Sequence, residues 1–215
     1  MTPSLLRTAA VASVVTLSLA ACNRTEPAEA PAPAESAPAA PAAQTPQGGF
    51  AGIESRMKEA MMAARGQDAG ETWARKMVPH HQGAIDMSRA VLGTTQDADI
   101  RRMAQKTVDM QTQDIADLER WLEGQAPPAG AAAAGGNPFQ AAEDRMHQAM
   151  MAASGEGDVL WARKMIPHHQ GAADLSRIVL EQSQDPAVRQ KAQKIIDDAQ
   201  KDIRELEAWL SKHGG

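Results

Sequence analysis

The sequence is poor in aromatic residues, in cysteine and in clustered basic charge, and each shortage excludes a class of protein. Aromatic residues make up 3% of the 215 positions and tyrosine is absent, which argues against a large β-sandwich or barrel because strands favour aromatic and β-branched side chains. The single cysteine allows no internal disulfide framework. Acidic residues (27) outnumber basic ones (22), so we expect no nucleic-acid partner.

The amino terminus has the pattern of an export signal. Arg7 precedes an apolar run at 9–20, which is shorter than the ~20 residues that a transmembrane helix needs. The run ends in LAAC at Cys22, and this ending resembles a bacterial lipobox. We therefore interpret residues 1–21 as a signal peptide and predict a lipid anchor at Cys22 on the periplasmic side. Asn23 favours the outer membrane, and an ordinary signal peptide cut near a stray cysteine is the alternative.

Two segments have the composition of linkers. Residues 22–49 alternate proline with alanine, and residues 124–138 combine proline, glycine and alanine. Neither contains enough apolar bulk to offset the entropy of ordering the chain. We predict that the first is a disordered tether to the membrane and that the second separates two folded segments.

Those two segments are copies of each other. Residues 73–92 and 161–180 are identical at 16 of 20 positions with an offset of 88, and the residues upstream of them match with an offset of 89. The two repeats span 50–123 and 139–212.

Each repeat has the apolar spacing and the good helix formers of three helices. The predicted helices lie at about 51–65, 71–92 and 97–123 in the first repeat and at 140–153, 158–181 and 185–212 in the second. We therefore predict an all-α protein in which two tandem three-helix repeats pack into one bundle. Because a 74-residue repeat has a thin core, we expect the second helices to pack on each other as a pseudo-twofold pair.

Histidine and methionine share one face of each second helix. At 100° per residue, His80, His81 and Met77 fall within an arc of about 120° that also holds apolar residues. Lys76 falls outside this arc. All methionines except Met1 lie in the two repeats. Methionine is also a common core filler, so plain packing is the alternative for those of the first helices.

Thioether sulfur and imidazole nitrogen together favour copper, above all Cu(I). Met77 can share an ion with His80 or His81, which follow at helical spacing. A complete site needs a sulfur from another helix, and Met57 or Met61 is the natural donor in the first repeat.

The motifs MVPHHQGAIDM and MIPHHQGAADL, each followed by a helix that ends in Trp-Leu, resemble the bacterial "domain of unknown function 305" family. The resemblance implies secreted or periplasmic proteins with a ferritin-like helical bundle, some of which bind copper. It implies metal ligands at Met77, His80, His81, Met87, Met165, His168 and His169, helped by Met57, Met61, Met146 and Met150. Leu175 departs from the family pattern, as do Asp114 and Asp202 where glutamate is usual, and Leu118 and Leu206 where methionine is common.

The two copies differ in their soft ligands. The first has Met87, Met103 and Met110 where the second has Leu175, Lys191 and Asp198, whereas the second gains His147 in place of Lys58. We expect the first copy to bind Cu(I) more tightly.

We therefore predict a lipid-anchored, periplasmic copper-binding protein that sequesters or hands over the metal, with Cu(II) or Ag(I) as alternative ions. A metal-free helical interaction module is the alternative function. Catalysis is not expected, because the chain contains no Glu-x-x-His, no Cys-x-x-Cys and no glycine-rich phosphate loop.

Overall fold

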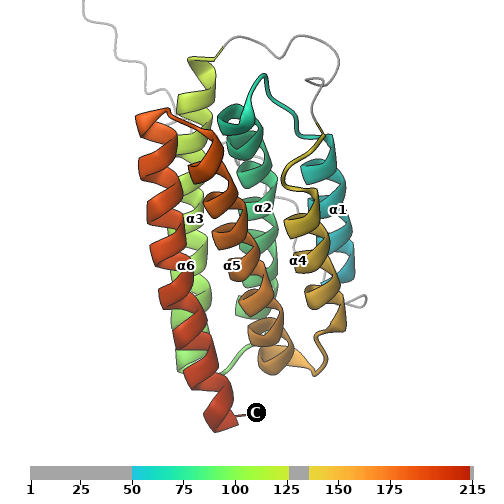
Figure 1. The fold of residues 1–215 in the computed structure, drawn as a ribbon. Helices are drawn as coiled ribbons and strands as arrows, with labels where there is room; N and C mark the ends of the chain where they lie inside the picture. Colours follow the sequence, from blue (N-terminus) through green and yellow to red (C-terminus); the bar gives the residue numbers. More distant parts are fainter. Residues whose placement is uncertain (1–49, 126–135, 214–215) are drawn as a thin grey trace, which may run out of the picture. The chain divides into compact units, whose positions relative to one another are not determined.

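Six helices account for nearly all of the residues that the structure describes (Figure 1). The computed structural model describes residues 50–125 and 136–213, and these ranges contain no strand. The helices are α1 (Ala51–Ala63), α2 (Ala69–Leu92), α3 (Ala98–Glu123), α4 (Gln140–Ala152), α5 (Gly157–Gln182) and α6 (Pro186–His213). The all-α prediction is confirmed. The predicted signal peptide, Cys22, the tether and most of the second linker lie outside the described residues.

Three of the six described helices, α2, α3 and α6, begin at an aspartate whose side chain caps them. The side chain of Asp68 accepts a hydrogen bond from the Glu71 amide at the start of α2. The side chain of Asp97 caps α3 in the same way. The side chain of Asp185 accepts from two amides of the first turn of α6, which begins with Pro186. These residues satisfy amides that have no partner inside the helix. The predicted starts of the described helices are correct to within two residues.

The helices form three side-by-side pairs, with α2 and α5 in the middle, α1 and α4 on one side, and α3 and α6 on the other (Figure 1). The middle pair is antiparallel, because Trp73 near the start of α2 donates to Ser176 late in α5 (3.3 Å), whereas His80 and His168 meet near the middle of both helices. The two repeats are therefore related by a pseudo-twofold axis near these histidines, and the expected packing of the second helices is present.

Two reciprocal ion pairs join the repeats inside the bundle. Lys76 of α2 pairs with Glu143 of α4 at 2.7 Å, and Lys164 of α5 pairs with Glu54 of α1 at 2.6 Å. The prediction that Lys76 lies off the buried face is wrong, because its side chain is fully buried. The helical wheel of one repeat cannot show that the other repeat covers this position and supplies the carboxylate.

Within the described ranges, no helix combines the length and the apolar character that crossing a membrane would require.

Candidate metal centre

The two His-His pairs meet where α2 crosses α5. The ring centroids of His80 and His168 are 3.9 Å apart, and each ring lies edge-on to the next histidine of its own helix, at 5.8 Å for His81 and 5.9 Å for His169. All four side chains are buried. The helices thus bring together imidazoles that are 88 residues apart in sequence.

Burial keeps these rings neutral. Desolvation lowers the pKa of His81 and His168 to about 3 and that of His169 to about 4, and it lowers the pKa of His80 well below its usual value. Their mutual repulsion acts in the same direction on His80 and His168. Neutral imidazole is the form that binds a metal ion.

Several ring nitrogens have no hydrogen-bond partner. Nε2 of His168 lies 3.0 Å from the carbonyl oxygen of His80. Since a carbonyl can only accept, this nitrogen carries the proton and Nδ1 of His168 keeps its lone pair. That Nδ1 is buried without a partner, as are both nitrogens of His80 and of His81. Buried polar atoms are normally paired. Each of these three neutral rings therefore has a nitrogen lone pair that no hydrogen bond uses.

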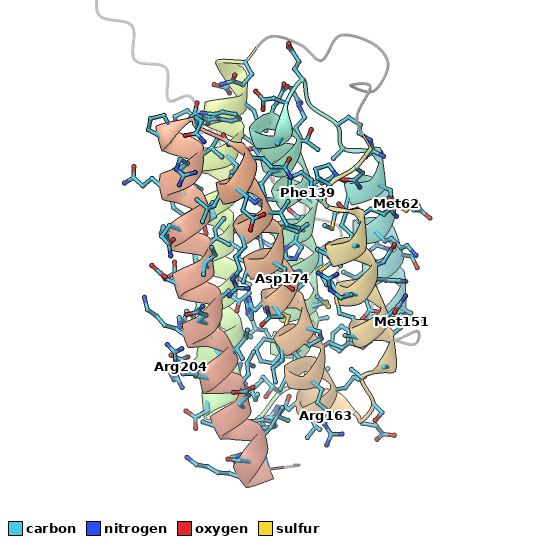
Figure 2. All side chains as sticks on the ribbon, viewed as in Figure 1. Met62, Phe139, Met151, Arg163, Asp174 and Arg204 are labelled. Carbon is cyan, nitrogen blue, oxygen red and sulfur yellow. The ribbon has the colours of Figure 1, made fainter. Side chains whose placement is uncertain are left out.

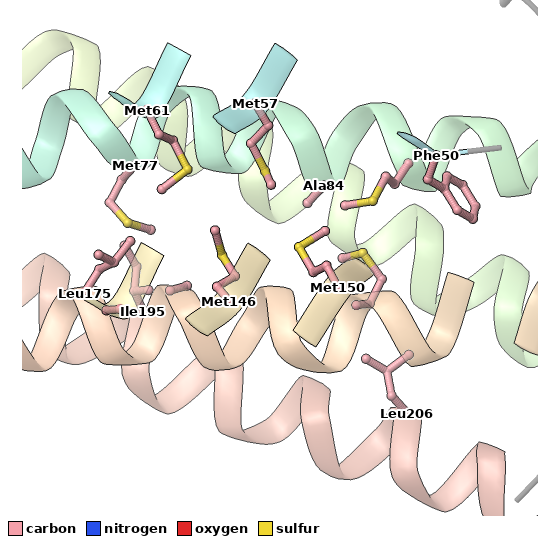
Figure 3. Close-up of a cluster of buried hydrophobic side chains, with 14 of the residues drawn as sticks. Phe50, Met57, Met61, Met77, Ala84, Met146, Met150, Leu175, Ile195 and Leu206 are labelled. Carbon is pink, nitrogen blue, oxygen red and sulfur yellow. The ribbon is translucent and has the colours of Figure 1, made fainter. Parts of the chain in front are cut away.

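Methionines of α1 and α4 pack against the two helices that carry the histidines. A Cβ on Gly83 would collide with the Met57 side chain, and a Cβ on Gly171 would collide with that of Met146. Gly83 comes one helical turn after His80, and Gly171 comes one turn after His168. Figure 3 shows Met57 and Met61 on one side of the buried cluster and Met146 on the other.

The opposite side of the histidines combines carboxylates with a thioether. His81 and His169 line a cavity of about 20 Å³ together with Asp114, Asp202 and Met110. Nε2 of His169 is 3.9 Å from Oδ2 of Asp202, and burial raises the pKa of Asp202. Lysines of the α3/α6 pair neutralise these carboxylates: Lys106 lies 2.7 Å from Asp202, and Lys194 lies 3.4 Å from Asp114.

The predicted ligand residues are all buried in the described structure. The histidines of both repeats form one group, and the methionines Met57, Met61, Met77, Met87, Met146, Met150 and Met165 belong to a single core cluster. Among residues 50–125 and 136–213, no three His, Cys, Asp or Glu side chains form a ready set of metal ligands. The side chains that pack one helical turn beyond His80 and His168, against Gly83 and Gly171, are the thioethers of Met57 and Met146.

Sequence reasoning missed the residues that position these side chains. Gly83 and Gly171 seat the methionines, and Lys76 and Lys164 hold the first helices through the carbonyls of Met61 and Met150 at 2.7 and 2.8 Å. A signal was present, because the glycines and the lysines are identical between the repeats at the offset of 88, and their partners Glu54 and Glu143 correspond at 89.

Comparison with known proteins adds a family and a fold. The family model described as "Domain of unknown function (DUF305)" matches residues 18–122 and 158–215. No curated protein matches the chain. CopM in its Cu(I)-bound form is 22% identical with a TM-score of 0.54, covering 68% of this chain and 98% of its own.

Two further structures resemble the chain to the same degree. CopM in an Ag-bound form is 21% identical with a TM-score of 0.54, covering 68% of this chain and 97% of its own. A DUF305 protein from Streptomyces coelicolor, described as secreted, is 22% identical with a TM-score of 0.53, covering 69% of this chain and 94% of its own. At these identities the likeness shows a shared fold.

Proposed function

We propose that this chain, which belongs to the family described as Domain of unknown function (DUF305), binds copper as Cu(I) at the crossing of α2 and α5. The ligands are drawn from His80 and His168 with the sulfur atoms of Met57 and Met146. The observation that carries the proposal is the group of buried imidazole nitrogens without hydrogen-bond partners.

The chemistry of the donors supports Cu(I) over harder ions. Thioether is a soft ligand and imidazole a borderline one, and together they suit Cu(I) and Ag(I) better than Mg²⁺ or Ca²⁺. The carboxylates nearest to the histidines, Asp114 and Asp202, are engaged by lysines. Two structures of similar fold hold Cu(I) and Ag, which agrees with this preference.

The remaining features favour storage or transfer of the ion outside the cytoplasm. The LAAC ending at Cys22 supports a lipid anchor, and a relative of similar fold is described as secreted. In this proposal the protein sequesters copper on the periplasmic side or passes it to another carrier. Its role is binding rather than catalysis.

A chelator competition tests the metal centre. The variant with both His80→Gln and His168→Gln removes two imidazoles, and we expect it to lose at least about tenfold in Cu(I) affinity, which corresponds to about 1.4 kcal/mol. The variant with Met57→Leu and Met146→Leu keeps the volume nearly unchanged and should lose affinity for Cu(I) more than for Cu(II).

The control is His213→Gln, because His213 stacks on Trp209 at the end of α6 and should leave the affinity unchanged. Wild-type protein that binds neither Cu(I) nor Ag(I), or a His80/His168 variant with full affinity, contradicts the proposal.

The lipid anchor has its own test. Mass spectrometry of the mature protein should find its first residue to be Cys22 with an acyl modification, and Cys22→Ser should release the protein from the membrane fraction. An unmodified amino terminus elsewhere would contradict the anchor.

A further inference from the structure

Two methionines are exposed at the protein surface, where large apolar side chains are uncommon. Met62 of α1 is 49% exposed and Met151 of α4 is 57% exposed, and they are the only exposed large hydrophobic residues in the described ranges. Figure 2 shows both at the outer surface of the α1/α4 pair. They occupy corresponding positions of the two repeats, at the offset of 89.

Met62 borders a cavity inside the bundle. Between α1 and α4 lies a cavity of about 10 Å³, lined by Met57, Lys58, Met61, Met62, Glu143, Asp144, Met146 and His147. Four thioethers and one imidazole therefore surround a space of the size of a single ion or water molecule. Met151 does not line it.

His147 adds an imidazole ring to the lining of this cavity. Its Nδ1 is buried and has no hydrogen-bond partner. The corresponding residue of the first repeat is Lys58, which cannot bind a metal ion while it is protonated. The cavity is thus a soft donor set with imidazole from the second repeat and exposed sulfur from the first.

The cavity is continuous with the proposed centre through shared side chains. Met57 and Met146 line it, and the same two side chains press against Gly83 and Gly171, one turn beyond His80 and His168. On the opposite side of the histidines, Lys106 pairs with Asp202 and Lys194 pairs with Asp114. The cavity between α1 and α4 is lined by four thioethers, whereas the cavity beside His81 and His169 has the single thioether of Met110, so the α1/α4 side is richer in soft ligands.

We propose that Met62 and His147 form an entry site for Cu(I) or Ag(I) between α1 and α4, from which the ion passes by Met57 or Met146 to the buried imidazoles. This inference rests on the proposed copper-binding function and assigns the route to that centre. Exposed sulfur captures the ion from solvent or from a carrier, and successive ligand exchange moves it inward without releasing it to water.

The two repeats supply a matched control. The test variant carries Met62→Leu and His147→Gln, which removes both entry ligands. The control variant carries Met151→Leu, which removes an equally exposed methionine at the corresponding position outside the cavity. Neither variant changes Met57 or Met146, or any of the four histidines His80, His81, His168 and His169.

Stopped-flow transfer of Cu(I) from its bathocuproine disulfonate complex to the full-length protein measures the rate, and equilibrium competition with the same chelator measures the affinity of the centre. We expect the entry variant to load at least about tenfold more slowly, a barrier increase of about 1.4 kcal/mol. Its affinity at the centre should stay within about threefold of wild type, and the Met151→Leu control should load at the wild-type rate.

Loading of the entry variant at the wild-type rate overturns the inference while leaving the proposed function intact. Equal slowing by Met151→Leu also overturns it, because general surface sulfur would then be responsible. Wild-type protein that binds no Cu(I) or Ag(I) at equilibrium overturns both proposals. Circular dichroism of the variants confirms that each remains helical.

Discussion

The four histidines at the crossing of α2 and α5 are buried as neutral rings, and this has a cost that depends on pH. In the unfolded chain a histidine takes up a proton near pH 6.5. In the folded protein, desolvation lowers the pKa of His81 and His168 to about 3 and of His169 to about 4. Below pH 6.5 the unfolded state therefore binds more protons than the folded state.

We accordingly predict that the metal-free protein loses stability as the pH falls from about 6.5 towards 4. Each buried histidine contributes up to about 1.4 kcal/mol per pH unit in this window and nothing above it. Urea unfolding with a copper chelator present, at pH 7.5, 6 and 5, measures the effect. A free energy of unfolding that is constant from pH 7.5 to 5 would contradict the prediction.

Lys76 is a second residue whose surroundings set its role. Burial lowers its pKa although Glu143 holds the charged form, and its Nζ also donates to the carbonyl of Met61. We predict that Lys76→Met destabilises the protein by about 3–5 kcal/mol, because it leaves the Glu143 carboxylate buried without its partner.

Adding Glu143→Leu to Lys76→Met should restore part of this loss, since two apolar side chains replace a buried pair at little cost. The exposed pair Arg102–Asp99 is the control, and Arg102→Ala should cost less than about 1 kcal/mol. Denaturant unfolding of the three variants measures the differences, and equal losses from Lys76→Met and Arg102→Ala would contradict the account.

At the scale of helices, glycine decides how closely α1 approaches α2 and α4 approaches α5. A Cβ on Gly83 would lie 2.5 Å from the sulfur of Met57. This is far inside normal contact, and the nearby Cγ and Cβ of the same side chain leave it little room to retreat. The absence of a side chain at Gly83 therefore holds the α1 methionine against the histidine-bearing helix.

We predict that Gly83→Ala destabilises the protein by about 1 kcal/mol, because overpacking of about 1–3 kcal/mol exceeds the gain in helix propensity. The same change at Gly52 is the matched control: a Cβ there meets only the end of Arg56 at 3.6 Å, so Gly52→Ala should be neutral or stabilising. Thermal unfolding of both variants is the measurement, and a Gly83→Ala variant more stable than wild type would show that the sulfur can move aside.

At the scale of the whole molecule, the two repeats depend on each other. The ion pairs Lys76–Glu143 and Lys164–Glu54 both cross between repeats, and so does the contact of His80 with His168. A repeat alone would expose the face of α2 or α5 that carries these residues. Small single cores of this size are also marginal in stability.

We predict that residues 50–123 and 139–212, produced separately, do not fold as stable monomers. Each should be poorly helical or self-associate, because in a dimer of the first half Lys76 can pair with Glu54 of the second copy. Mixing the two halves should restore helicity and cooperative melting. Circular dichroism and sedimentation measure this, and either half folding as a monomer with the melting temperature of the full chain would contradict the interdependence.

The sequence alone determines the helices, the repeat and the kind of donor atoms. Helical spacing and the Pro-His-His motifs are local signals, and they predict the helices and an inward face of histidine and methionine. The identity between repeats also marks the lysines and glycines that matter, although without saying what they contact.

Only the tertiary structure shows that the histidines of the two repeats lie side by side. Three contacts depend on how the helices cross: that of His80 with His168, that of Lys76 with Glu143, and that of Met57 with Gly83. The periodicity of a single helix reports which residues face inward but carries no information about the helix opposite. The antiparallel crossing of α2 and α5 therefore determines which nitrogens and sulfur atoms can act together.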